Sequence, residues 1–133
     1  MVKRVVITGM GVISSIGNDV PTFWDNLKKG VCGIDYIEDF PTNELPVKIA
    51  GKIKGFEVEK YGMDKPFIRK QDLFTQFGVA AAYQAMEDSG LKSQGEGKNI
   101  DPFRLGVYVG SGIGGFEVQF KETAKMIEDP SEQ

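Results

Sequence analysis

The sequence contains no histidine, and this absence rules out several kinds of self-contained active site. Without an imidazole, the chain has no side chain whose ordinary pKa lies near neutrality, so it cannot by itself hold a Ser-His-Asp or Cys-His site. Zinc sites also lose their most frequent nitrogen ligand. If the chain belongs to an enzyme that uses such chemistry, we expect it to hold only part of the site.

Cysteine and long apolar runs are scarce as well. The single cysteine, Cys32, cannot form a disulfide framework, which favours a cytoplasmic protein. No apolar run is long enough to span a bilayer, and the opening MVKRVVITGMG is interrupted by glycine too early for a secretory signal. The net charge of −3 argues against general nucleic-acid binding. With 133 residues, the chain can form one core, and we expect one domain.

The stretch VVITGMGVISSIGND combines a predicted buried strand, Lys3 to Thr8, with a loop that contains Gly9 and Gly11. A dinucleotide-binding fingerprint needs a third glycine where this chain has Ser14, and a P-loop needs a lysine that the loop does not contain. A tight turn is therefore favoured, and a nucleotide-binding α/β domain stays as the weaker alternative.

The periodicity of apolar residues predicts the other elements. We expect a helix from about Pro21 to Lys29, a half-exposed strand over 47–54, a long interior helix from about Arg69 to Ser89, a strand from Leu105 to Val109, and a helix from about Phe116 to Glu128. The long helix carries Gly78 and several alanines, including Ala81 and Ala85, so neighbouring backbone can approach it closely.

A strand, a glycine loop and a helix follow one another twice, at TGMGVISSIG and at VGSGIGGFE. Four segments together cover the whole chain in order: RVVITGMGVISSIGN, the W-x-x-L-x-x-G-x-x-G-I run, RKQDLFTQFGVAAAYQAMEDSGL and GVYVGSGIGG. In these segments and in their order, the chain resembles the β-ketoacyl-acyl-carrier-protein synthases, particularly the FabF-like elongating condensing enzymes of the thiolase superfamily.

The resemblance implies a thiolase-like layered α-β-α-β-α fold, of which residues 1–133 form an incomplete N-terminal half with no second domain. It implies a decarboxylative Claisen condensation of an acyl thioester with malonyl-acyl carrier protein in fatty acid elongation, by a homodimer that uses no cofactor and no metal. The family's catalytic cysteine and two histidines lie beyond this chain, so the chain alone is predicted to be inactive. The alternative within the resemblance is a non-catalytic partner similar to a chain-length factor.

Residue assignments follow from the resemblance and from local chemistry. Cys32, in GVCGID, is expected to be structural and not the nucleophile. Lys65, Arg69 and Lys70 are predicted to dock the acidic acyl carrier protein, because a basic cluster at the start of a helix is unfavourable for the helix dipole alone. Ile113, the one bulky residue in GSGIGG, is either core or a wall of the acyl-chain pocket, and the resemblance favours the pocket wall.

Overall fold

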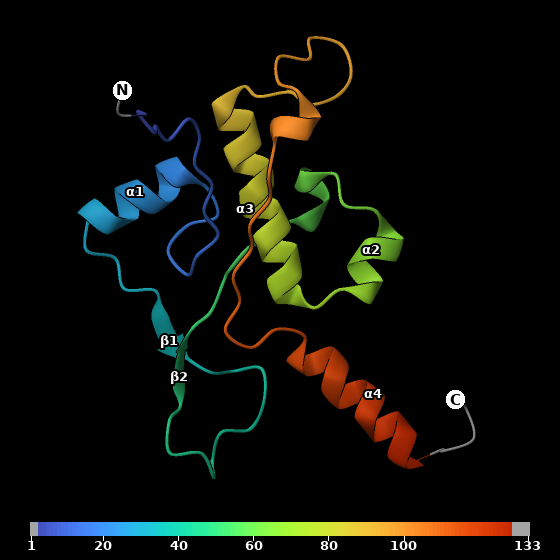
Figure 1. Cartoon of the computed structure of the whole chain (residues 1–133). Helices are drawn as coiled ribbons and strands as arrows, with labels where there is room; N and C mark the ends of the chain where they lie inside the picture. Colours follow the sequence, from blue (N-terminus) through green and yellow to red (C-terminus); the bar gives the residue numbers. More distant parts are fainter. Residues whose placement is uncertain (1–2, 129–133) are drawn as a thin grey trace. The chain divides into compact units, whose positions relative to one another are not determined.

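The structure is a computed structural model that describes residues 3–128 (Figure 1). The elements, in chain order, are α1 (Val20–Lys28), β1 (Ile34–Tyr36), β2 (Ile49–Gly51), the 3-10 turn η1 (Val58–Tyr61), α2 (Lys65–Lys70), α3 (Leu73–Ser89), the 3-10 turn η2 (Pro102–Arg104) and α4 (Phe116–Glu128). They divide into two compact units, and the boundary passes through α3. The first unit comprises the chain up to Glu57 with Ala80–Gly90, and the second comprises Val58–Val79 with the chain from Leu91 onward.

Helix α1 confirms the predicted helix after the first glycine loop. Asp19 precedes it in an extended conformation, and its carboxylate accepts hydrogen bonds from the Thr22 amide at 2.7 Å and the Thr22 hydroxyl at 2.8 Å. Pro21 stands in the first turn, where its missing N–H is not needed. Gly30, with φ of +67°, follows the helix and ends it.

The glycines of the N-terminal segment lie directly against the backbone of α3 in the first unit. A Cβ added to Gly9 would lie 2.2 Å from the carbonyl oxygen of Ala85, and one added to Gly11 would lie 1.9 Å from that of Ala81. No side chain fits in such gaps. The expected close approach of backbone to the small residues of the helix is therefore confirmed.

Polar side chains of α3 hold the same segment by its amide groups. The amide of Met10 donates to the carboxylate of Asp88 at 2.9 Å, and the amide of Val12 donates to Oε1 of Gln84 at 3.1 Å. Nε2 of Gln84 donates in turn to the carbonyl of Asn18 at 2.7 Å. Because these bonds supply backbone partners that a sheet would otherwise supply, the segment is ordered without belonging to a strand.

Two of the predicted strands are not formed among the described residues. Lys3 to Thr8 and Leu105 to Val109 are extended but have no strand hydrogen bonds, and their side chains stay in water: Val5 is 94% exposed and Tyr108 is 98% exposed. The predictions were wrong for this structure because a strand exists only when a neighbouring strand pairs with it. The apolar pattern of a buried strand cannot supply that neighbour.

The third predicted strand, over 47–54, is confirmed only at its centre. β2 pairs antiparallel with β1, with Ile34 opposite Gly51 and Tyr36 opposite Ile49. All residues of both strands are exposed, so the pair has no dry face. Two strands are marginally stable by themselves, which accounts for the short pairing.

The predicted long helix is two helices. α2 ends at Lys70, Gln71 is extended with φ of −111° and ψ of 138°, and α3 runs from Leu73 to Ser89, ended by Gly90 as predicted. The expectation of an interior helix is met only at Ala80, which is 0% exposed, and Gln76, which is 7% exposed, the buried residues of the described range. It is wrong for the large apolar side chains of α3, since Leu73 is 52% and Phe74 44% exposed. No helix within residues 3–128 has the length and apolar character that crossing a membrane requires.

Candidate functional site

Two of the three predicted docking residues lie at the end of α2, in the second unit. The carboxylate of Asp64 caps the start of this helix by accepting from the Phe67 amide at 2.8 Å. Arg69 and Lys70 occupy the last turn, where the helix dipole favours cations. The argument that this basic cluster stands unfavourably at a helix start was therefore wrong, because a helix end had been taken for a beginning.

The three residues that were predicted to dock a partner all lie on the surface of the described chain. Lys65, Arg69 and Lys70 are exposed, and none of them forms an ion pair with another described residue. Some lysines elsewhere in the described chain are paired: Nζ of Lys54, for example, lies 2.9 Å from the Asp35 carboxylate. The positive charges at both ends of α2 are thus not neutralised by a carboxylate within the described chain.

Gln76 connects α2 to the first turns of α3. Its Nε2 donates to the carbonyl of Ile68 and to the carbonyl of Gln71, both at 3.1 Å. These carbonyls lie at the C-terminal end of α2, where backbone acceptors have no partner within their own helix. The single buried polar side chain of the described range therefore fixes the turn that carries Arg69 and Lys70.

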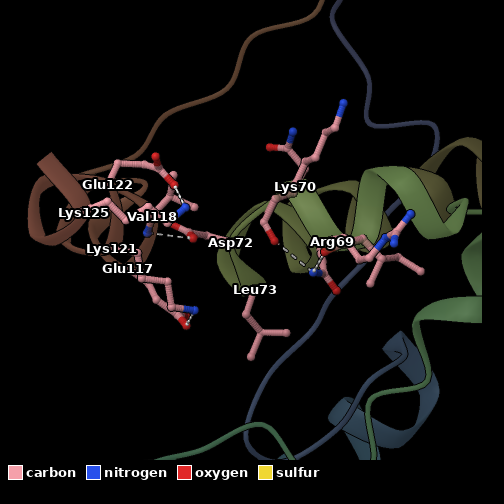
Figure 2. A pocket seen from close by; sticks show the side chains of 12 residues that line it. Arg69, Lys70, Asp72, Leu73, Glu117, Val118, Lys121, Glu122 and Lys125 are labelled. Atoms are coloured by element: carbon pink, nitrogen blue, oxygen red, sulfur yellow. Dashed lines mark hydrogen bonds and ion pairs between the residues drawn. The ribbon is translucent and has the colours of Figure 1, made fainter. Parts of the chain in front are cut away.

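Asp72, between α2 and α3, connects this region to α4. Its carbonyl accepts from the amides of Thr75 and Gln76, which begins α3. Its carboxylate oxygen Oδ1 accepts from the amide of Val118 in the first turn of α4 at 3.2 Å (Figure 2). The other oxygen, Oδ2, is buried and has no hydrogen-bond partner among the described residues.

The side chains between the α2–α3 junction and α4 surround a cavity of about 570 Å³. Figure 2 shows Arg69, Lys70 and Asp72 on one side of it and Glu117 and Lys121 on the other. Nζ of Lys121 lies 2.5 Å from the Glu117 carboxylate. This hydrogen bond and the charge of Glu117 raise the pKa of Lys121, and the charge of Asp72 adds to the effect. The cavity is a polar one in which both signs of charge are present.

Ile113 lies in the loop before α4, outside that cavity. It is 82% exposed, so it does not fill core within the described chain. The end of the loop is packed on α3: a Cβ added to Gly114 would lie 2.8 Å from Cζ of Phe74. Gly110 and Gly112 have nothing within 4 Å of an added Cβ. The loop is therefore anchored at one end and open around Ile113.

Cys32 belongs to the first unit, whereas the other predicted site residues belong to the second. It is exposed, and its thiol lies 3.9 Å from the carbonyl of Ile34. No basic side chain pairs with it in the described range, so its structural role remains a prediction.

A larger cavity in the first unit has apolar walls. It measures about 830 Å³ and lies between the glycine loop and α1, with Met10, Val20, Phe23 and Trp24 among its lining residues. Phe23 and Trp24 both belong to α1, the helix that the sequence predicts. Trp24 keeps 56% of its surface exposed, so this side of the helix is not covered by described residues.

The sequence analysis missed the roles of Asp72 and Gln76. An Asp before an apolar helical run is a signal for a cap on the helix that follows it. Nothing in the pattern links it to an amide 46 residues later. The break at Gln71 was missed as well, although four consecutive polar residues, Arg69 to Asp72, interrupt the apolar pattern there.

Comparison with known proteins identifies the family. Residues 2–132 match the family described as beta-ketoacyl synthase, N-terminal domain, and the chain belongs to this family. The resemblance stated from the sequence is thereby confirmed, and the chain is similar to the N-terminal domain of proteins named 3-oxoacyl-[acyl-carrier-protein] synthase 2.

Two similar proteins from different bacteria carry the same name. The chain is 48% identical over 116 residues to 3-oxoacyl-[acyl-carrier-protein] synthase 2 of Vibrio cholerae, covering 87% of this chain and 27% of the relative. It is 45% identical over 127 residues to the protein of the same name from Staphylococcus aureus, covering 96% of this chain and 29% of the relative. The chain thus spans under a third of the length of these relatives.

A solved structure is also similar to this chain. The ishigamide ketosynthase/chain length factor matches with a TM-score of 0.59 and 34% identity, over 66% of this chain and 22% of that one. The family and this neighbour imply a thiolase-like fold. The described residues themselves form helices and one two-stranded sheet, so the predicted layering stays a prediction.

Proposed function

We propose that the complete protein is a 3-oxoacyl-[acyl-carrier-protein] synthase that elongates fatty acids. The observation that carries this proposal is the family match over residues 2–132, together with 48% identity to a relative of that name. In the reaction, the acyl group is held as a thioester on the enzyme's cysteine. Malonyl thioester loses carbon dioxide, the resulting carbanion attacks the acyl carbonyl carbon, and the cysteine thiolate leaves.

This chain would contribute scaffold and binding surface to that reaction, and the nucleophile and histidines would come from beyond residue 133. The proposed complete enzyme is a cytoplasmic homodimer with a layered α-β-α-β-α fold, and residues 1–133 are part of its single synthase domain. The close packing of Gly9 and Gly11 on α3 supports this reading over a nucleotide-binding loop, because α3 fills the space that a phosphate would need.

Lys65, Arg69 and Lys70 are proposed to dock acyl carrier protein. They are exposed, have no carboxylate partner among the described residues, and stand on a short helix whose end Gln76 fixes. An acidic partner would be attracted by such unpaired charge, mostly through a faster encounter. Ile113 is proposed to line the acyl pocket, and its exposure in a loop of small residues supports this.

The test is an elongation assay of the complete protein with acyl- and malonyl-carrier protein, with a matched variant in which Arg69 and Lys70 are both changed to Glu. The wild type should form the 3-oxoacyl product. The double variant should show a higher KM for both carrier substrates and a weaker dependence on salt, since surface charges are screened within about 10 Å at 0.1 M salt. Changing Lys29, an exposed lysine of the first unit, to Glu should leave KM unchanged.

A wild-type protein with no condensing activity would contradict the main proposal. It would favour the second candidate, a non-catalytic partner similar to a chain-length factor, which the name of the solved neighbour brings into consideration. In that case, activity should appear only when a catalytic synthase subunit is added. Unchanged KM values in the double variant at low ionic strength would remove the docking patch and leave the enzymatic proposal standing.

A further inference from the structure

Asp72 makes a hydrogen bond that its place in the chain does not predict. An Asp directly before a helix normally accepts from an amide in the first turn of that helix. The side chain of Asp72 instead accepts from Val118 in α4, and in the described chain no other hydrogen bond to its carboxylate is formed. The residue thus starts α3 with its backbone and caps α4 with its side chain.

The geometry at α4 favours a carboxylate. Val118 is the third residue of the helix, and amides in the first turn have no acceptor within the helix. A negative charge is also stabilised at a helix N-terminus. Gly115, whose carbonyl begins α4 by accepting from Gln119 at 2.8 Å, has φ of +68°, and a Cβ added there would lie 3.7 Å from Oδ2 of Asp72. The last residue of the GSGIGG loop therefore lies against the carboxylate.

Residues at the start of α3 contact both α2 and α4. Gln76 bonds the end of α2, Asp72 bonds the start of α4, and Phe74 packs on Gly114. The turn with Arg69 and Lys70 and the loop with Ile113 are thus attached to the same few residues. Because these contacts all come from residues 72–76, a displacement of one attachment would move the other.

We propose that Asp72 is a positioning residue for acyl-chain selection: by capping α4 it fixes the GSGIGG loop, and with it Ile113, relative to the end of α2. This inference rests on the proposed function, because it takes Ile113 as pocket wall and α2 as docking helix. The carboxylate touches no substrate. It sets where the pocket wall stands when the carrier protein binds beside it.

The test uses the complete protein with Asp72→Ala, Asp72→Asn and, as a matched control, Glu117→Gln, which removes a neighbouring carboxylate that does not cap the helix. The first readout is hydrogen exchange of the Val118 amide. Exchange should be about fivefold faster in Asp72→Ala, the factor that corresponds to the ~1 kcal/mol typical of a helix cap. Asp72→Asn keeps an acceptor oxygen and should lie between Asp72→Ala and wild type.

The second readout is the ratio of kcat/KM for a long acyl primer to that for a short one. A loop released in Asp72→Ala should change this ratio by up to about fivefold, the factor that corresponds to the ~1 kcal/mol of a lost helix cap. Asp72→Asn should restore most of it, and Glu117→Gln should match wild type. The same primer series on Ile113→Ala should show the larger change, since Ile113 acts directly.

Three results would overturn the proposal: unchanged exchange at Val118, equal loss for long and short primers in Asp72→Ala, or an equal effect of Glu117→Gln. If Asp72→Ala fails to fold, Asp72→Asn carries the comparison: its Val118 exchange and its primer ratio should then differ from wild type in the same direction by a smaller factor, and no difference in either would overturn the proposal. A wild-type protein without condensing activity would contradict the proposed function, and this inference with it, whereas an active wild type with an unaltered primer ratio in Asp72→Ala would contradict only the role of Asp72.

Discussion

Replacing Gly11 by alanine tests the packing on which the first unit depends. The new Cβ would lie 1.9 Å from the carbonyl oxygen of Ala81 and 2.8 Å from Cβ of Gln84. Ordinary contact begins near 3.4 Å, so the segment must move by about 1.5 Å, because the helix backbone it meets cannot yield. That movement would stretch the 3.1 Å hydrogen bond between the Val12 amide and Gln84 beyond bonding distance.

The expected cost is the overlap plus the lost hydrogen bonds, about 2–4 kcal/mol in all. We expect a lower midpoint of urea unfolding in the complete protein and faster hydrogen exchange of the amides of Met10 and Val12. The matched control is Gly78→Ala in α3, where an added Cβ meets nothing within 4 Å. It should be neutral or stabilise by up to about 1 kcal/mol. If the two variants behave alike, the N-terminal segment does not lie on α3 as described.

Four further predictions concern other parts of the chain. Lys54 lowers the pKa of Asp35, mainly through the hydrogen bond that it donates to the carboxylate. The ion pair therefore stabilises the fold above the ordinary aspartate pKa, and this stability is lost as the pH falls through the lowered pKa of Asp35. Lys54→Met should raise the pKa of Asp35 in an NMR titration. Gln76→Leu leaves two α2 carbonyls unpaired and should destabilise by about 1–3 kcal/mol in urea unfolding, whereas an exposed Glu59→Gln should not. Ile113→Phe should block long acyl primers and spare short ones with little change in melting temperature, and a uniform loss with a lower melting temperature would make Ile113 core. The 133-residue chain by itself should form no elongation product and should self-associate in sedimentation experiments, because much apolar surface stays in water, and a monodisperse, active preparation would refute this.

Helices α1 and α4 were predictable from the sequence because their signals are local. Asp19, Pro21 and Gly30 define α1 within a dozen residues, and the apolar stripe of α4 gave its bounds directly. The strands were not predictable in the same way. Val5 to Ile7 has the composition of a buried strand, but composition says nothing about which segment pairs with it, and none does in the described chain.

The candidate site was also predictable only in its local features. Exposed cations on α2 and one branched side chain among small residues at Ile113 are visible in the sequence, and the structure shows them exposed. The connections between them are not visible, because the bond from Val118 to Asp72 joins residues 46 positions apart. The C-terminal end of α2 at Lys70 was missed, because the predicted helix began at Arg69 and the two-residue break at Gln71 and Asp72 was not recognised.

The two glycine loops differ in why they lack side chains. Gly9 and Gly11 are required by α3, since any Cβ there would overlap its backbone. Gly110 and Gly112 have open space and no positive φ, so no described residue requires them to be glycine. Gly78 meets the same two conditions, so open space by itself points to no ligand. Under the proposed function, the open side of the loop is where Ile113 would meet the acyl chain or the protein that lines its channel.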